Sequence, residues 1–247
     1  MSVGRSPRRV EPRWSSPQHG TAETAGGPIA QGSEHALDAQ GSDRTVDFVR
    51  QTADLLILHK FAIDEVMTRL RIWSEEFDHT HEHDPIEHIT SRVKRPEAIA
   101  AKLRRRGLPV TPESARKNLT DIAGIRVVCP FLSDVYLIRD LFHRHETEIV
   151  QTKDYIANPK PNGYRSLHLI TKVPVHLSER TEHVFAEIQI RTIAMDFWAA
   201  VEHELGYKSG GAVPPAVADE LQDAAETAAV LDARMNALHE RSKMLRS

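Results

Sequence analysis

Two acidic residues stand beside segments whose composition is typical of buried strands. Asp121 comes shortly before the apolar run Ile125–Cys129, and Glu187 lies within Val184–Arg191, where apolar and polar side chains alternate. This alternation places Glu187 on the polar face of its strand. Hard cations that carry phosphate ligands are commonly held by such carboxylates. The pair is therefore a candidate for binding Mg²⁺ between the phosphates of a nucleotide.

Three neighbours of these carboxylates belong to the same candidate site. Gln189 shares the polar face of its strand with Glu187. Gly124 permits a close approach of the backbone. Arg126 has two interpretations: its guanidinium pairs with Asp121, or it stacks on a base.

A dense group of basic residues precedes Asp121. Its members are Arg92, Lys94, Lys102, Arg104, Arg105, Arg106, Arg116 and Lys117. On a helix, Lys102, Arg105 and Arg106 would share one face, because they are three and four residues apart. Several cations on one surface suit a triphosphate, although a solvated charged face is the alternative. Arg92 and Lys94, just upstream, favour phosphate binding.

The segment Lys153–His168 joins a turn-forming loop to aromatic and basic side chains. Its residues 158–163 are rich in Asn, Pro and Gly, and the strand predicted after them begins at Tyr164. Lys160, Arg165 and His168 flank the Tyr164 ring, which could be a platform for a base and its phosphates. The alternative is that the tyrosine is packing material, as it often is in strands.

Several other classes of protein are excluded or disfavoured. The sequence has neither a Gly-x-Ser-x-Gly elbow nor a P-loop pattern. Its formal net charge of -3 does not suggest a general nucleic-acid binder, so RNA is a conceivable but unsupported partner. Cys129, the single cysteine, is expected to be a buried structural thiol in a reducing cytoplasm. Neither a membrane span nor a secretory signal is predicted.

The elements that must position these residues form a mixed α/β or α+β domain, with a mixed sheet flanked by helices. The expected helices cover Val46–Phe77, a segment from Pro96 that Gly107 closes, Leu132–Arg144, and Ile193–Tyr207 with Thr192 as N-cap. The expected strands cover Ile125–Cys129, Tyr164–Val173 and Val184–Arg191.

The chain divides into three parts. Residues 1–44 are poor in large apolar residues and are expected to be a disordered tail. Residues 45–210 carry the candidate site. Residues 211–247 have an apolar register from Val217 to Leu245 that predicts a helix seeking a partner, which favours a homo-oligomer. The segment His79–Asp84 contains residues of metal-ligand type, but its spacing fits no standard zinc pattern, so a solvated linker is expected.

These motifs, taken in order, resemble the RelA/SpoT family, in particular its small stand-alone alarmone synthetases. The similar stretches are Ile89–Lys94, Asp121–Arg126, Lys153–His168 and Glu187–Lys208. The resemblance implies a nucleotidyltransferase-like sheet and a GTP pyrophosphokinase, which transfers the diphosphate of ATP to the 3′-hydroxyl of GDP or GTP. It also implies a terminal helix that builds a tetramer.

The resemblance assigns roles residue by residue. ATP would be bound by Arg92, Lys94, Lys102, Arg105 and Arg126. Asp121 would be a Mg²⁺ ligand, and Glu187 either a second ligand or the base that activates the 3′-hydroxyl. The acceptor nucleotide would be bound by Lys160, Tyr164, Arg165, His168 and Gln189, with Glu202 or His203 as further candidates. His83 and Asp84 lack the companions of the family's hydrolase motif, so synthesis without hydrolysis is expected.

Two other functions remain as hypotheses from the sequence. One is a catalytically degenerate sensor that binds a guanine nucleotide or RNA. The other is a synthetase with a different acceptor, such as an adenine nucleotide, because stacking on Tyr164 does not discriminate between purines. The sequence leaves open the preference among GDP, GTP and GMP, and regulation by product or RNA.

Overall fold

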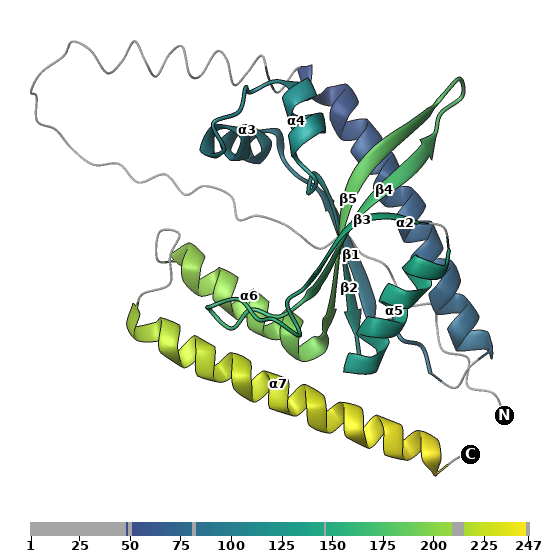
Figure 1. The fold of residues 1–247 in the computed structure, drawn as a ribbon, viewed down its shortest axis with the longest axis vertical. Helices are drawn as coiled ribbons and strands as arrows, with labels where there is room; N and C mark the ends of the chain where they lie inside the picture. Colours follow the sequence, from purple (N-terminus) through teal and green to yellow (C-terminus); the bar gives the residue numbers. More distant parts are fainter. Residues whose placement is uncertain (1–47, 49–50, 81–82, 146, 209–214, 246–247) are drawn as a thin grey trace, which may run out of the picture.

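The computed structural model describes residues 48, 51–80, 83–145, 147–208 and 215–245 (Figure 1). The tail predicted over residues 1–44 lies outside the described residues. The elements run in the order α2 (Ala53–Thr80), β1 (His88–Val93), α3 (Pro96–Arg105), α4 (Pro112–Asn118), β2 (Ala123–Cys129), α5 (Leu132–Arg144), β3 (Glu148–Asp154), β4 (Leu167–His176), β5 (Thr181–Thr192), α6 (Ile193–Lys208) and α7 (Pro215–Met244). Among the described residues, no helix is long and apolar enough to cross a membrane.

A mixed sheet organises the molecule, in the strand order β1-β2-β5-β4-β3. The pair β2 and β5 is parallel, and the other neighbouring pairs are antiparallel. Figure 1 shows α2 and α5 on one side of this sheet and α6 with α7 on the other. This arrangement confirms the predicted mixed sheet flanked by helices.

One face of the sheet builds the core with α2 and α5. The predicted alternation in β5 is confirmed, since Val184, Ala186, Ile188 and Ile190 are all buried. They pack in one cluster with Leu70 and Trp73 of α2 and Phe142 of α5. Glu187 and Gln189 consequently lie on the opposite face, away from the core.

Several predicted boundaries are confirmed and others are wrong. Helix α5 has the predicted bounds, and Thr192 caps α6 through its Oγ1, which accepts the backbone N–H of Met195 at 3.1 Å. Strand β4 begins at Leu167 rather than at Tyr164, because the preceding segment turns: Gly163 has φ 84°. The strands β1 and β3 and the helix α4 were not predicted.

The C-terminal helix α7 divides its apolar register between two surroundings. In its first half, Leu221 and Ala225 are buried against Trp198 of α6, whose Nε1 donates to the carbonyl oxygen of Leu221 at 2.8 Å. In its second half, several apolar side chains are exposed: Val230, Leu231, Met235, Leu238 and Met244. The apolar face predicted for this helix is thus partly buried by contacts within the same chain.

Cys129 lies at the end of β2 and is fully buried. Burial raises the pKa of its thiol well above the ordinary value, and the nearby charge of Asp134 acts in the same direction. The predicted burial of this thiol is thus confirmed, and the raised pKa favours its protonated form.

Candidate active site

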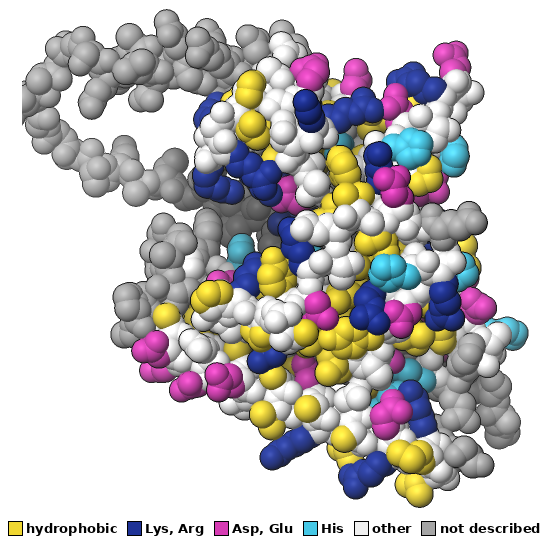
Figure 2. Space-filling model, viewed as in Figure 1, with side chains coloured by type: hydrophobic (Ala, Val, Ile, Leu, Met, Phe, Trp, Pro, Cys, Tyr) yellow, Lys and Arg dark blue, Asp and Glu magenta, His cyan; other side chains and the backbone are white. Residues whose placement is uncertain are grey.

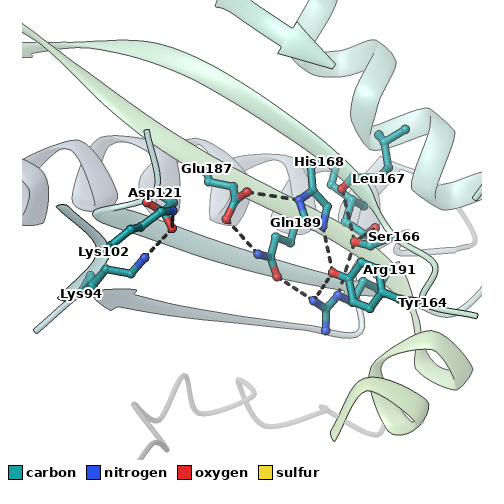
Figure 3. Close-up of polar contacts among 11 residues, drawn as sticks. Lys94, Lys102, Asp121, Tyr164, Ser166, Leu167, His168, Glu187, Gln189 and Arg191 are labelled. Carbon is teal, nitrogen blue, oxygen red and sulfur yellow. Dashed lines mark hydrogen bonds and ion pairs between the residues drawn. The ribbon is translucent and has the colours of Figure 1, made fainter. Parts of the chain in front are cut away.

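The polar face of the sheet brings the two predicted carboxylates together. In the parallel pair β2 and β5, Gly124 lies opposite Glu187, and Asp121 enters just before β2. Figure 3 shows Asp121 and Glu187 on the same side of the sheet. The two carboxylates are close enough to interact: the negative charge of Asp121 acts to raise the pKa of Glu187, although other contacts outweigh this effect. Both carboxylates therefore lie on the polar face of the sheet, where the alternation predicted Glu187.

Asp121 is bound by two lysines from different elements. Its Oδ2 accepts from the Nζ of Lys94, which follows β1, and from the Nζ of Lys102 on α3, the latter at 2.6 Å. Burial alone would raise the pKa of Asp121, but the hydrogen bonds from Lys102 and Lys94 hold it below its ordinary value. Its other oxygen, Oδ1, is buried and has no hydrogen-bond partner among the described residues. The carboxylate is thus ionised and keeps one oxygen for a further ligand.

The basic residues that were predicted to form one phosphate-binding group have different surroundings in the structure. Arg92 lies on β1 opposite Gly124, and Arg105 is exposed on α3. Figure 2 shows Lys and Arg side chains gathered over α3. Arg116, however, forms an ion pair with Glu182 of β5, and thus does not belong to the group around Asp121.

Arg126 forms an ion pair with Asp196 of α6, its NH1 lying 3.0 Å from Oδ1. Of the two interpretations made from sequence, the pairing with Asp121 is not the one that the structure adopts. The same Asp196 oxygen also contacts Arg191 at 3.3 Å. Gly124 is not required by steric crowding, because an added Cβ would lie 3.7 Å from the nearest atom, the carbonyl oxygen of Arg92.

Glu187 belongs to a closed ring of hydrogen bonds (Figure 3). Its Oε1 lies 3.2 Å from Nδ1 of His168, and its Oε2 accepts from Nε2 of Gln189 at 2.9 Å. Arg191 donates to Oε1 of Gln189 and to the hydroxyl oxygen of Tyr164, both at 2.7 Å. The Tyr164 hydroxyl closes the ring at 2.9 Å from Nε2 of His168.

This ring determines the charge and orientation of Glu187. Burial favours the protonated acid, but the hydrogen bond and charge of His168, with the hydrogen bond from Gln189, bring the pKa of Glu187 below its ordinary value. The carboxylate is therefore ionised at neutral pH. Both of its oxygens have protein partners, in contrast to those of Asp121.

Some of the residues predicted to form an acceptor platform lie around the Tyr164 ring. Lys160 Nζ lies 4.4 Å from the centroid of this ring, and the guanidinium carbon of Arg191 lies 5.3 Å from it. Tyr155 meets the ring edge-on at 6.1 Å. Arg165 points elsewhere: its NH1 donates to the carbonyl oxygen of Ile156 at 3.0 Å, so in this structure it supports the loop rather than the platform.

Sequence reasoning missed the central position of Arg191. Its side chain is buried, with 4% exposure, and contacts Tyr164, Gln189 and Asp196. The available signal was its alternation with Glu187 and Gln189, which places all three on one face. Asp196, which contacts both Arg126 and Arg191, had no comparable signal, because it lies in the next helix.

A mixed sheet that presents two ionised carboxylates among lysines and arginines defines a phosphate-handling α/β domain. The family described as "Region found in RelA / SpoT proteins" matches residues 91–212. The GTP pyrophosphokinase YwaC of Bacillus subtilis is 51% identical over 181 residues, which cover 73% of this chain and 86% of that relative. The GTP pyrophosphokinase YjbM of the same organism is 38% identical over 188 residues, 76% of this chain and 88% of that protein. The chain belongs to the RelA/SpoT family.

Solved structures agree with this assignment. The small alarmone synthetase 2 of Bacillus subtilis has a TM-score of 0.70 and 48% identity, covering 76% of this chain and 97% of its own. The small alarmone synthetase 1 of Bacillus subtilis, solved with its product pppGpp, has a TM-score of 0.72 and 37% identity, covering 78% and 98%. The similarity therefore extends over nearly the whole of these small synthetases.

Proposed function

We propose that this protein is a GTP pyrophosphokinase that transfers the β,γ-diphosphate of ATP to the 3′-hydroxyl of GDP or GTP. The products are ppGpp or pppGpp, and AMP. The observation that carries the proposal is the single polar face on which Asp121, among lysines, lies beside Glu187 and the Tyr164 platform. The names of the relatives support the same reaction.

ATP would bind on the side of Asp121. Lys94 and Lys102 both form ion pairs with that carboxylate, so phosphates bound beside Asp121 would lie near two ammonium groups. Burial lowers the pKa of Lys94 despite the hydrogen bond to Asp121, which reflects a partly desolvated cation. Arg92, Arg105 and Arg126 are the further candidates for contacts with the phosphates or the adenine.

Mg²⁺ is the proposed cofactor, and the residues present fit it. Asp121 offers a buried Oδ1 that has no other partner in the described part of the chain, and carboxylates together with substrate phosphates are the ligands that Mg²⁺ prefers. Glu187 is the second candidate ligand. When bound, the ion would neutralise charge on the transferred phosphates.

The acceptor nucleotide would bind on the side of Tyr164, with its base stacked on the ring. Lys160 and His168 contact the Tyr164 side chain, and Gln189 is linked to it through Arg191; these residues provide a cation and polar groups for the acceptor. Arg165 would contribute directly only if its side chain left the carbonyl oxygen of Ile156.

The reaction is an in-line displacement at the β-phosphorus of ATP. The 3′-oxygen of the acceptor forms the new oxygen–phosphorus bond, and the bond from the β-phosphorus to the oxygen bridging to AMP breaks. The ionised Glu187 is suited to accept the proton of the 3′-hydroxyl, because His168 and Gln189 fix its orientation. Lys94 and Lys102 stabilise the charge that develops on the phosphates, so catalysis rests mainly on positioning and electrostatics.

The proposal is tested by incubating the purified protein with ATP, Mg²⁺ and, separately, GDP, GTP, GMP or ATP as acceptor. Anion-exchange chromatography should resolve AMP and a guanine nucleotide with two additional phosphates. Binding without product would indicate the sensor, and product only with an adenine acceptor would indicate the other synthetase. Added ppGpp should persist during the same incubation if the protein lacks hydrolase activity.

The protein is further proposed to be a cytoplasmic homo-oligomer, with a tetramer favoured. The exposed apolar side chains in the second half of α7 support this, because a second copy of the helix could cover them: Val230, Leu231, Met235 and Leu238. Light scattering during size-exclusion chromatography would measure the mass, and a monomer at micromolar concentration would contradict the proposal.

A further inference from the structure

Three potential metal ligands, none of them among the proposed nucleotide-binding residues, converge on one another. They are His83, which precedes β1, Asp134 in the first turn of α5, and His239 near the end of α7. One ligand atom from each lies within 4.8 Å of the others. Figure 1 shows the second half of α7 passing close to α5, and the backbone N–H of Ser133 donates to Oδ1 of Asn236 at 2.8 Å.

Two members of this cluster have an ordinary structural explanation. His83 Nε2 lies 2.8 Å from Oδ2 of Asp134. The same carboxylate oxygen accepts the backbone N–H of Phe131 at 3.2 Å, which caps the beginning of α5. Asp134 is only 2% exposed, so its charge is shielded from water. A capping carboxylate paired with a histidine would account for these contacts.

The third member has no such explanation. His239 Nε2 is buried and lacks a hydrogen-bond partner among the described residues. Its ring is held by Phe131, which stacks on it with centroids 4.0 Å apart and planes at 16°. The rings of His239 and His83 are 4.7 Å apart. Because buried imidazole nitrogens normally have partners, a missing ligand would explain this arrangement.

We propose that His83, Asp134 and His239 bind one divalent transition-metal ion of the Zn²⁺ type. Two imidazole nitrogens and one carboxylate oxygen are a ligand set that such ions accept, with water in the fourth position. Metal–ligand bonds of roughly 2.0–2.2 Å place tetrahedral ligand atoms about 3.4 Å apart. The three ligand atoms, which lie within 4.8 Å of one another, would have to approach that separation when the ion binds. The set differs from the all-oxygen surroundings that Mg²⁺ prefers at Asp121.

The ion would join three segments that are distant in sequence. Through its ligands it would cross-link the second half of α7 to the beginning of α5 and to the segment before β1. A hydrogen bond from the backbone N–H of Ser133 to Asn236 already links the beginning of α5 to α7 close to this cluster. A metal that binds only the folded chain also stabilises it, in proportion to the logarithm of its concentration over Kd.

The experiment uses the full-length protein, free of any histidine tag and treated with chelator. Equilibrium dialysis against Zn²⁺ should give one tightly bound ion per chain. Co²⁺ in its place should produce the visible absorption of a tetrahedral site, which Mg²⁺ in excess should not remove. Zn²⁺ at about 100 times its Kd should raise the Tm by about 5 °C or more.

The variants His239→Ala and His83→Ala should each weaken Zn²⁺ binding at least about tenfold and abolish the Co²⁺ absorption. His143→Ala is the matched control, because this histidine is exposed on α5 and lies outside the cluster. Circular dichroism verifies that each variant is folded. If one variant does not fold, Zn²⁺ binding by the other variant tests the proposal. Absence of stoichiometric Zn²⁺ binding, or wild-type binding by a folded His239→Ala or His83→Ala protein, would overturn the proposal.

Discussion

Asp121 and Glu187 lie on the same face of one sheet, yet their surroundings differ. Asp121 is held by two ammonium groups through one oxygen, and its other oxygen has no partner in the described part of the chain. Glu187 has a partner on each oxygen, His168 and Gln189. The first arrangement keeps a coordination position available beside cations, whereas the second fixes the orientation of an ionised carboxylate.

This difference separates the two proposed roles. Asp121 is suited to bind Mg²⁺ and phosphates, because its Oδ2 is held by two lysines while its Oδ1 has no partner in the described part of the chain. Glu187 is suited to receive a proton, because its hydrogen bonds orient it toward an acceptor on Tyr164. Substitutions that remove only one of these properties distinguish the roles.

The largest effect is expected from Glu187→Gln. The amide keeps the shape of the side chain but cannot accept the proton of the 3′-hydroxyl, so kcat should fall by about 10³–10⁴-fold. Binding of both nucleotides, measured by calorimetry, should change little. Glu182→Gln is the matched control, since Glu182 lies on the same strand and pairs with Arg116 and Arg180. Full activity of Glu187→Gln would refute its role in proton transfer.

Asp121→Asn should reduce kcat less, by about 100-fold, and should change the response to Mg²⁺. The substitution removes the charge that the two lysines neutralise and weakens a ligand of the ion. The Mg²⁺ concentration for half-maximal activity should therefore rise at least about tenfold. Steady-state rates over a Mg²⁺ titration provide the measurement. Asp140→Asn on α5 is the control, and an unchanged Mg²⁺ response in Asp121→Asn would remove Asp121 as a ligand.

Tyr164 allows stacking to be separated from hydrogen bonding. Tyr164→Ala should raise the KM for GDP or GTP by about 10–100-fold, as expected from the loss of one base–aromatic stack. Tyr164→Phe keeps the ring but removes the hydroxyl that links His168 and Arg191, so it should affect mainly kcat, and by less. The KM for ATP should stay near the wild-type value in both variants. An equal rise in both KM values would contradict a platform specific to the acceptor.

The parts of the site that the sequence predicted come from strongly patterned segments. The alternation in β5 correctly placed Glu187 and Gln189 on the polar face. By contrast, β1 and β3 are the edge strands of the sheet, and most of their side chains are at least partly exposed. Their sequences therefore lack the apolar alternation by which half-buried strands are recognised. The helix α4, which begins with a proline, was not predicted because its 7 residues are too few to show a helical apolar period.

Tertiary contacts limited the rest of the prediction. The pairing of Arg126 with Asp196 joins a strand to a helix 70 positions later, which no local pattern reveals. The closure of the ring through Arg191 also depends on how β4 and β5 align. In the segment His79–Asp84, sequence spacing gave no reason to single out His83, because its neighbours in space come from α5 and α7.

The smallest effect on activity is expected at Gly163, in the loop that carries Tyr164. This glycine has φ 84°, and a Cβ there would lie 2.6 Å from the Cβ of Ala225 on α7. Gly107 has a similar φ of 66° but nothing within 4 Å of its added Cβ. Both alanine variants therefore carry the strain of positive φ, about 1–2 kcal/mol, while only Gly163→Ala also clashes with α7.

Gly163→Ala should consequently lose about 1–3 kcal/mol more stability than Gly107→Ala, measured by urea unfolding. Its KM for the acceptor should rise a few-fold, because the clash displaces the loop that positions Tyr164. Adding Ala225→Gly to Gly163→Ala should recover the KM, since it removes the contacting methyl group. Equal stability of the two single variants would show that α7 does not constrain the loop.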